Sequence, residues 1–267
     1  LRDMMNISGQ AIRDLNEHGR LLAVSQATCD WYLARGVDSQ RIQVLYNGVA
    51  LDQFVPGDND GTLRRDLALA EDVPILGGIG QLGLRKGWEI LLEAMLMVRS
   101  DFPEVHLTIV GERHSEKQEV IDYERHLVEM ASHEQLRGHV HLLGRRDDVP
   151  ALLQQWTALI HPARQEPLGR VLLEAAASGC PVVATEVGGT REIFPAAASD
   201  GALLVPSESP REMAESICQV LRLPRLRHDL SAAGPLRASK CFNVLQSAAR
   251  LVEHYREVTQ ASRQGLS

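Results

Sequence analysis

Two glutamates that stand eight residues apart, Glu166 and Glu174, are the residues of this chain best suited to chemistry. Glu166 follows an apolar run across a short loop, and Glu174 lies inside a stretch with a helical pattern. Pro167 suits the first turn of that helix, where its missing N–H group is not needed. Gly169 lets a ligand approach the free N–H groups of the turn, which together form an anion site. A phosphate site flanked by carboxylates, which accept hydrogen bonds from hydroxyls, indicates a nucleotide sugar as the ligand.

The same residues also fit a purely structural role. Glutamates near the start of a helix favour the helix dipole and are common without function. Leu172, Leu173 and Ala176 would bury one face of any helix that packs on a sheet. Spacing alone therefore favours the structural interpretation, and a longer pattern is needed to decide.

The segment from His161 to Ile193 supplies that pattern, because it resembles the donor-site signature of the group 1 retaining glycosyltransferases of GT-B fold. The family shows a glutamate, seven residues and a second glutamate, then small residues, an apolar strand and a Gly-Gly loop followed by glutamate. The corresponding residues here are Glu166, Glu174, Gly179, Pro181-Val182-Val183-Ala184, Gly188-Gly189 and Glu192. The resemblance implies that Glu166 lies against the donor sugar and that Glu174 holds the ribose hydroxyls.

The residues between the two glutamates would line the same donor site. The resemblance places Pro167, Leu168 and Gly169 in the loop, with the backbone N–H groups of the last two facing the diphosphate. Leu168 stands where the family usually has phenylalanine. Arg170 stands where an aliphatic residue is common, and we include it among the donor-binding candidates.

A second match lies in residues 80–87, directly after the apolar segment 73–79. The family often shows Gly-Arg-Leu, three variable residues and Lys-Gly, and its arginine and lysine bind the donor diphosphate. Such a leaving group gains charge as the sugar bond breaks, so cations are needed beside it. Lys86 matches the lysine, but Gln81 replaces the arginine. Either Arg85 supplies the lost charge or the site is weakened.

The glycines of the same segment also spell a dinucleotide-binding pattern. Gly78, Gly80 and Gly83 fit G-x-G-x-x-G after a predicted strand. Residues 84–87 separate Gly83 from the helical pattern that begins at Trp88, so the third glycine would not lie in the first helical turn. We therefore interpret this pattern as coincidental.

Two further loops fit the family. Gly111 matches one glycine of a family turn, and Arg145 lies in a loop that the resemblance places under the nucleotide base. Asp147 and Asp148 are expected to cap the helix over 149–156 rather than to bind a metal. His161, at a strand end, is expected to be packed. The histidines show no metal spacing and the family generally works without a bound metal, so no cofactor is expected.

The elements that must position these residues alternate between apolar strands and helices. Strands are expected over 21–24, 41–46, 73–79, 105–110, 140–143, 157–161, 181–185 and 202–205, with helices between them and three more after residue 210. Continuous apolar strands predict a Rossmann-like parallel sheet with helices on both faces. The family resemblance implies that this sheet is the C-terminal half of a GT-B fold. Ligands bind beyond the carboxyl ends of such strands, so the candidate loops should converge on one crevice.

We expect three parts in the chain. Residues 1–20 would be a linker or the last helix of a missing N-terminal acceptor domain, with a helical pattern over 4–19. Residues 21–238 would form the nucleotide-sugar-binding domain, and residues 239–267 a C-terminal crossover helix and tail. The chain is therefore expected to be a fragment with little transfer activity of its own.

Composition excludes several classes of protein. The chain has 267 residues, 44% of them hydrophobic, and no apolar stretch reaches the roughly 18 residues of a membrane span. Its net charge of −7 does not favour a nucleic-acid surface. Four scattered cysteines are typical of reduced thiols in a cytoplasmic protein. Any association with the inner face of a membrane would come from the missing domain.

The sequence thus predicts the donor-binding domain of a retaining glycosyltransferase. It would use a UDP-, GDP- or ADP-sugar as donor and an acceptor hydroxyl on an unknown glycan or lipid, with Glu166 and Lys86 as catalytic residues. Two alternatives stay open. One is a sugar-nucleotide epimerase of the same fold, and the other, which Gln81 favours, is a non-catalytic nucleotide-sugar-binding domain.

Overall fold

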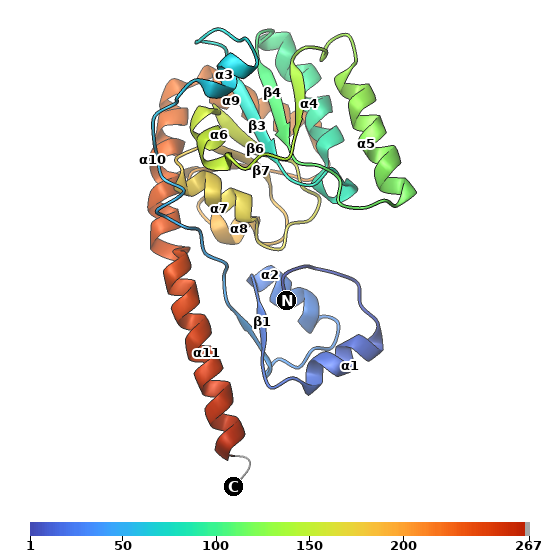
Figure 1. Cartoon of the computed structure of the whole chain (residues 1–267), viewed down its shortest axis with the longest axis vertical. Helices are drawn as coiled ribbons and strands as arrows, with labels where there is room; N and C mark the ends of the chain where they lie inside the picture. The colour runs from blue at the N-terminus through green and yellow to red at the C-terminus, as the bar shows by residue number, and fades with distance from the viewer. Residues whose placement is uncertain (265–267) are drawn as a thin grey trace.

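A parallel sheet of six strands forms the centre of the larger unit, as the apolar runs predict (Figure 1). The structure is a computed structural model that describes residues 1–264. The strand order is β5-β4-β3-β6-β7-β8. The bounds are β3 (Ile75–Ile79), β4 (His106–Val110), β5 (Val140–Gly144), β6 (Ala158–His161), β7 (Val182–Thr185) and β8 (Ala202–Val205). From β3 the chain adds β4 and β5 on one side, and then β6, β7 and β8 on the other side. The switch point therefore lies between β3 and β6, and open α/β sheets bind ligands at such a point.

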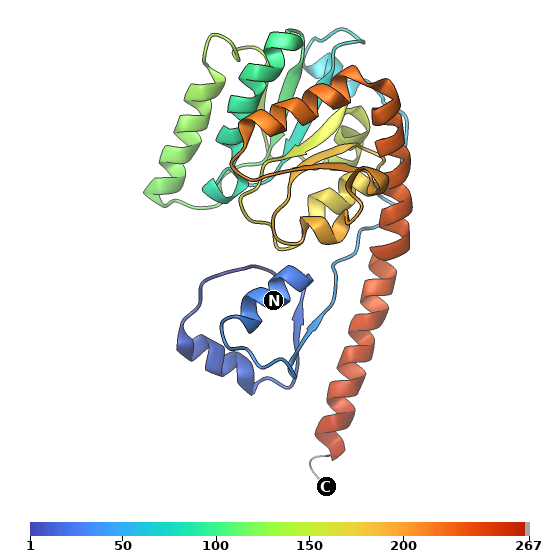
Figure 2. The same cartoon turned by 180° about the vertical axis from the view of Figure 1, so that it is seen from behind.

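Helices cover both faces of this sheet (Figures 1 and 2). One face carries α4 (Trp88–Asp101), α5 (Gln118–Ala131) and α9 (Pro210–Arg222), and the other carries α6 (Val149–Gln155), α7 (Arg170–Ala177) and α10 (Pro224–Cys241). Successive strand residues enter opposite cores: Leu159 packs with the second group of helices and Ile160 with the first. Burial on both faces explains why the strands are apolar at most positions.

The first 45 residues form a smaller unit with its own sheet, which corrects the expected domain boundary. It contains α1 (Gly9–Glu17), β1 (Leu21–Ala23), α2 (Gln26–Leu33) and β2 (Ile42–Val44). β1 pairs only with β2, in parallel, around a separate small core. The two strands expected at the start of the donor domain therefore lie outside the six-stranded sheet, and the break falls between β2 and α3 (Thr62–Asp66).

The chain crosses between the units twice, and the two crossings lie side by side. Val49 and Asn243 form an isolated bridge, and a Cβ on Gly48 would lie 2.3 Å from the Cα of Val244. The last two of the three helices expected after residue 210 are α10 and α11 (Val244–Gln264), and Phe242 is buried in the core between them.

α11 then runs beside the smaller unit, where Arg20 contacts Glu257 and lies 2.9 Å from His254 (Figure 1). Residues 265–267 of the predicted tail lie outside the described residues. The remaining short elements are η1 (Leu84–Lys86), α8 (Thr190–Ile193) and η2 (Ala197–Asp200). Within residues 1–264, every helix is too short or too polar to cross a membrane.

Candidate functional site

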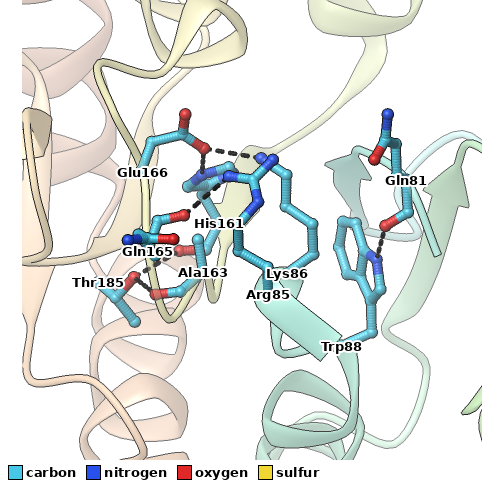
Figure 3. Close-up of polar contacts among 9 residues, drawn as sticks. All are labelled: Gln81, Arg85, Lys86, Trp88, His161, Ala163, Gln165, Glu166 and Thr185. Atoms are coloured by element: carbon cyan, nitrogen blue, oxygen red, sulfur yellow. Dashed lines mark hydrogen bonds and ion pairs between the residues drawn. The ribbon is translucent and has the colours of Figure 1, made fainter. Parts of the chain in front are cut away.

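Lys86 and Glu166 meet at the switch point of the sheet, one after β3 and the other after β6 (Figure 3). The Lys86 Nζ lies 2.7 Å from the Glu166 Oε2, and the two side chains are only 11% and 9% exposed. The close approach confirms that the loops after these two strands converge. It also places a cation and an anion side by side with little solvent to screen them.

His161, the last residue of β6, is the second partner of Glu166. Its Nε2 lies 2.9 Å from the same Oε2 atom, and its side chain is fully buried. Burial, and then the Lys86 charge, lower the pKa of His161, so the ring is neutral and acts on Glu166 as a donor through Nε2–H. The expectation that His161 is packed is confirmed, but sequence reasoning missed its contact with Glu166.

Glu166 stays ionised in this setting. Burial alone would raise the pKa of its carboxyl group, but the hydrogen bond from His161 and the charge of Lys86 outweigh burial and lower the pKa well below the usual range. Both contacts use Oε2, whereas Oε1 points away from His161 and Lys86 (Figure 3). The carboxylate is therefore fixed through one oxygen and presents the other.

Arg85 joins this group, but Gln81 does not. The Arg85 Nη1 donates to the Gln165 carbonyl at 2.9 Å, which holds the guanidinium beside the Glu166 loop (Figure 3). The exposed Gln81 side chain points away from Lys86 and Glu166, and its backbone carbonyl accepts from the Trp88 indole at 2.9 Å. Arg85, the residue expected to supply the charge lost at Gln81, therefore lies near Glu166, whereas the Gln81 side chain does not (Figure 3).

The loop after Glu166 differs from the prediction in one respect. α7 begins at Arg170, so Pro167 lies before the helix and not in its first turn. The reason is Gly169, which adopts a left-handed φ of 99° as the N-cap residue. Within residues 1–264, no residue accepts a hydrogen bond from the N–H groups of Leu168 or Gly169. These two donors therefore have no partner among the described residues, and their predicted contact with an anion stays a prediction.

The Gly188-Gly189 loop holds the Glu166 backbone. The Gly189 N–H donates to the Glu166 carbonyl at 2.9 Å. Gly188 has a φ of 52°, and a Cβ on it would lie 2.0 Å from the same oxygen. Only glycine fits so close to the chain in this conformation.

Glu174 and Arg170 lie one helical turn apart on α7. Their closest atoms are 3.4 Å apart, and Arg170 is 77% exposed while Glu174 is 17% exposed. Burial raises the pKa of Glu174, and the Arg170 charge only partly opposes it. Arg170 is therefore a weak, solvent-screened partner, and the Glu174 carboxylate is largely uncompensated.

The outer loops of the same sheet edge carry Gly111 and Arg145. Gly111 serves chain packing: its N–H donates to the Gly144 carbonyl at 2.8 Å, and a Cβ would lie 2.0 Å from the Gly80 carbonyl. Arg145 is 72% exposed and lies 3.3 Å from Asp147. The capping prediction for α6 is wrong, because the Asp148 carboxylate pairs with Arg146 at 2.6 Å instead of with the helix.

A cavity of about 740 Å³ lies at the opposite, amino-terminal ends of the strands. Its lining includes Pro74, Thr157 and Pro181, the residues that precede β3, β6 and β7, and none of the predicted site residues. We assign the candidate site to the carboxyl edge, because that edge collects the buried charges and the free N–H groups.

Comparisons with known proteins identify the family of the chain. Residues 59–237 match the family model described as glycosyl transferases group 1. The D-inositol 3-phosphate glycosyltransferase of Geodermatophilus obscurus is 32% identical over 237 residues, which cover 82% of this chain and 48% of the relative. That of Corynebacterium urealyticum is 28% identical over 241 residues, with 86% and 55% covered. The chain spans about half the length of these curated relatives.

Solved structures give the same assignment. The crystal structure of Anabaena HepE in complex with UDP and glucose has a TM-score of 0.87 and 25% identity to this chain, with 96% of this chain and 70% of that one covered. The structure of WaaG, a glycosyltransferase involved in lipopolysaccharide biosynthesis, shares the fold at a TM-score of 0.72 and 22% identity, over 87% of this chain and 62% of that one. The architecture matches that of GT-B glycosyltransferases. The chain belongs to the group 1 glycosyltransferase family.

Proposed function

We propose that this chain binds a nucleotide diphosphate sugar at the switch point between β3 and β6. It would supply the donor half of a retaining glycosyltransferase that transfers the sugar to an acceptor hydroxyl. The observation that carries the proposal is the Lys86–Glu166 pair at 2.7 Å beside the free N–H groups of Leu168 and Gly169. Cations and free N–H groups suit a diphosphate, and a buried carboxylate suits sugar hydroxyls.

Each residue then has a role that its position supports. Lys86, Arg85 and the two N–H groups stabilise the charge that develops on the leaving diphosphate. Oε1 of Glu166 accepts a hydrogen bond from the sugar, and its negative charge stabilises positive charge at the sugar ring. His161 keeps Glu166 ionised and oriented through Oε2.

The remaining candidate residues line the nucleotide part of the same site. Glu174 accepts from the ribose hydroxyls, and its scarcity of other partners favours such a ligand. Gly111 and Arg145 lie nearer the base, at the ends of β4 and β5. No metal is required, because Lys86 and Arg85 provide the positive charge beside the diphosphate.

UDP is the nucleotide that we favour, because HepE is described in complex with UDP-glucose. The acceptor would bind between the carboxyl edge of the sheet and the smaller unit, which contact each other where Gln165 donates to the Met4 carbonyl at 3.1 Å.

A thermal-shift titration tests the proposal. UDP-, GDP- and ADP-glucose are added in turn to the chain and to its Glu174→Ala variant. A ligand at a hundred times its dissociation constant stabilises the fold by about 2.7 kcal/mol. We expect a shift with UDP-glucose that Glu174→Ala removes and that the control Glu215→Ala, on the exposed surface of α9, retains. A shift that both variants retain, or no shift with any nucleotide sugar, would overturn the proposed site.

Product analysis separates the epimerase alternative. The chain is incubated with the bound nucleotide sugar alone, and the products are examined by NMR spectroscopy. Conversion to an epimeric sugar nucleotide without an acceptor would favour the epimerase, whereas unchanged donor agrees with a glycosyltransferase domain.

A further inference from the structure

Glu192 reaches from the larger unit to the smaller one. It lies in α8, and its two carboxylate oxygens accept hydrogen bonds from the N–H groups of Gln26 at 2.7 Å and Ala27 at 2.8 Å. These are the first two N–H groups of α2, which no residue within that helix can satisfy. Glu192 therefore caps α2 from the other unit, an arrangement that the helix dipole also favours.

The backbone that carries Glu192 is itself held in place. Arg237, on α10, donates to the carbonyls of Glu192 and Ile193, both at 2.8 Å. Burial and the neighbouring Glu192 carboxylate raise the pKa of Tyr46, at the crossing between the units, to about 12. The cap is thus anchored to the core of the larger unit.

The start of α2 also touches the donor loop. Ser25, the N-cap residue of α2, is fully buried and donates its hydroxyl to the Pro167 carbonyl. The Thr28 hydroxyl lies 3.4 Å from the same oxygen. The Glu166 carbonyl, one residue earlier, is held by Gly189. Two successive carbonyls of the loop are therefore fixed, one by each unit.

This contact sets the direction of a donor-facing group. The Pro167 carbonyl and the Leu168 N–H belong to one planar trans peptide, so they point in opposite directions. With the carbonyl directed at Ser25, the Leu168 N–H must point away from α2. No residue within 1–264 accepts from this N–H group.

We propose that Glu192 is a positioning residue for the donor site. By capping α2 it holds Ser25 against the Pro167 carbonyl, and the peptide then aims the Leu168 N–H at the donor diphosphate. Donor affinity consequently depends on how the smaller unit is seated on the larger one. The identity of the ligand rests on the proposed function, whereas the mechanical link between Glu192 and the loop does not.

The binding test compares UDP with uridine, which lacks the diphosphate. Glu192→Ala should weaken UDP by about tenfold, because small misplacements of a binding group are costly. The affinity for uridine should change by less than about twofold, since the nucleoside does not contact the loop. Glu186→Ala is the matched control, because Glu186 lies on the same segment but pairs with exposed Arg191. Equal affinities for UDP in the two variants, or an equally large loss of affinity for uridine, would overturn the proposal.

A double variant tests whether Glu192 acts through Ser25. Ser25→Ala should lower the affinity for UDP to a similar extent. The double variant should bind UDP about as tightly as the single variant with the lower affinity. Additive losses would mean that the two residues act independently and would contradict the link.

A third measurement needs no ligand and separates this inference from the proposed function. Amide hydrogen exchange at Gly189 reports its bond to the Glu166 carbonyl. Glu192→Ala and Ser25→Ala should both speed this exchange, although neither side chain bonds to Gly189. Acceleration confined to residues 26–28 would leave Glu192 as a local helix cap and overturn the positioning role. If the unmodified chain binds no nucleotide but Gly189 responds, the proposed function fails and the mechanical link stands.

Discussion

Removing either charge of the Lys86–Glu166 pair should destabilise the fold, while removing both charges should destabilise it less than either single change. The pair is nearly enclosed, with both side chains about one-tenth exposed. Lys86→Met leaves a buried carboxylate whose one remaining side-chain partner within residues 1–264 is neutral His161. Glu166→Gln keeps an oxygen that can accept from His161 but leaves the Lys86 ammonium without a counter-charge.

The magnitude follows from the burial. Removing one partner of a buried ion pair typically costs about 3–5 kcal/mol, because the other charge is left uncompensated. The small remaining exposure places each single variant near the lower end, at about 3 kcal/mol. In the double variant no charge is left without a partner, and the total loss of stability should be about 2 kcal/mol. The coupling energy is therefore about 4 kcal/mol.

Equilibrium urea denaturation at pH 7 of the four proteins measures this coupling. The control is the same cycle at Arg170 and Glu174, with Arg170→Ala and Glu174→Gln, because this pair is 3.4 Å apart and largely exposed on the arginine side. Its coupling should not exceed about 1 kcal/mol. Additive losses at Lys86 and Glu166, or a coupling equal to the control, would refute the conclusion that the two side chains form a buried pair.

Three further predictions concern acid stability, a close backbone contact and the diphosphate charge. Burial and two neighbouring histidines lower the pKa of His106 to about 4, so between pH 7 and 5 the unfolded chain takes up a proton that the folded chain refuses. Stability should fall by about 1–2 kcal/mol, and urea denaturation of His106→Gln should show a smaller fall; equal falls would contradict this. Gly111→Ala should lower the free energy of unfolding by more than about 2 kcal/mol, because its Cβ would lie 2.0 Å from a backbone oxygen. Gly83→Ala should lower it far less, because a Cβ on Gly83 would have no atom within 4 Å. Similar denaturation midpoints for the two variants would contradict the close contact. Calorimetry should show that Arg85→Ala lowers the affinity for UDP by about tenfold and that Gln81→Ala lowers it by less than about twofold. The reverse order would assign the contact with the diphosphate to Gln81 instead of Arg85.

Much of the larger unit could be predicted from the sequence, because strands buried on both faces are apolar at most positions. The strand over 202–205 agrees with β8 at both ends. The separate sheet of the smaller unit could not be predicted. β1 is apolar throughout and β2 contains one polar residue, Gln43, as several strands of the larger sheet also do. Their pairing with each other, which is a non-local property, is what sets them apart.

The site likewise contains features that the sequence could predict and features that it could not. Glu166 and Lys86 could be located because a motif fixes each one within its own loop, and the convergence of strand ends brings the loops together. Pro167 was misplaced because the left-handed conformation of Gly169 delays the helix. The contacts of Ser25 and Glu192 were missed, since they join residues more than a hundred positions apart and no local pattern marks them.

The most direct test of the donor site is the change in backbone amide NMR shifts when UDP-glucose is added. If the ligand binds at the carboxyl edge between β3 and β6, the largest changes should fall on Lys86, Leu168, Gly169 and Glu174. Thr157, at the opposite end of the sheet, should not respond. Largest changes at that opposite end, or no change in residues 166–170 at saturating ligand, would contradict the assignment.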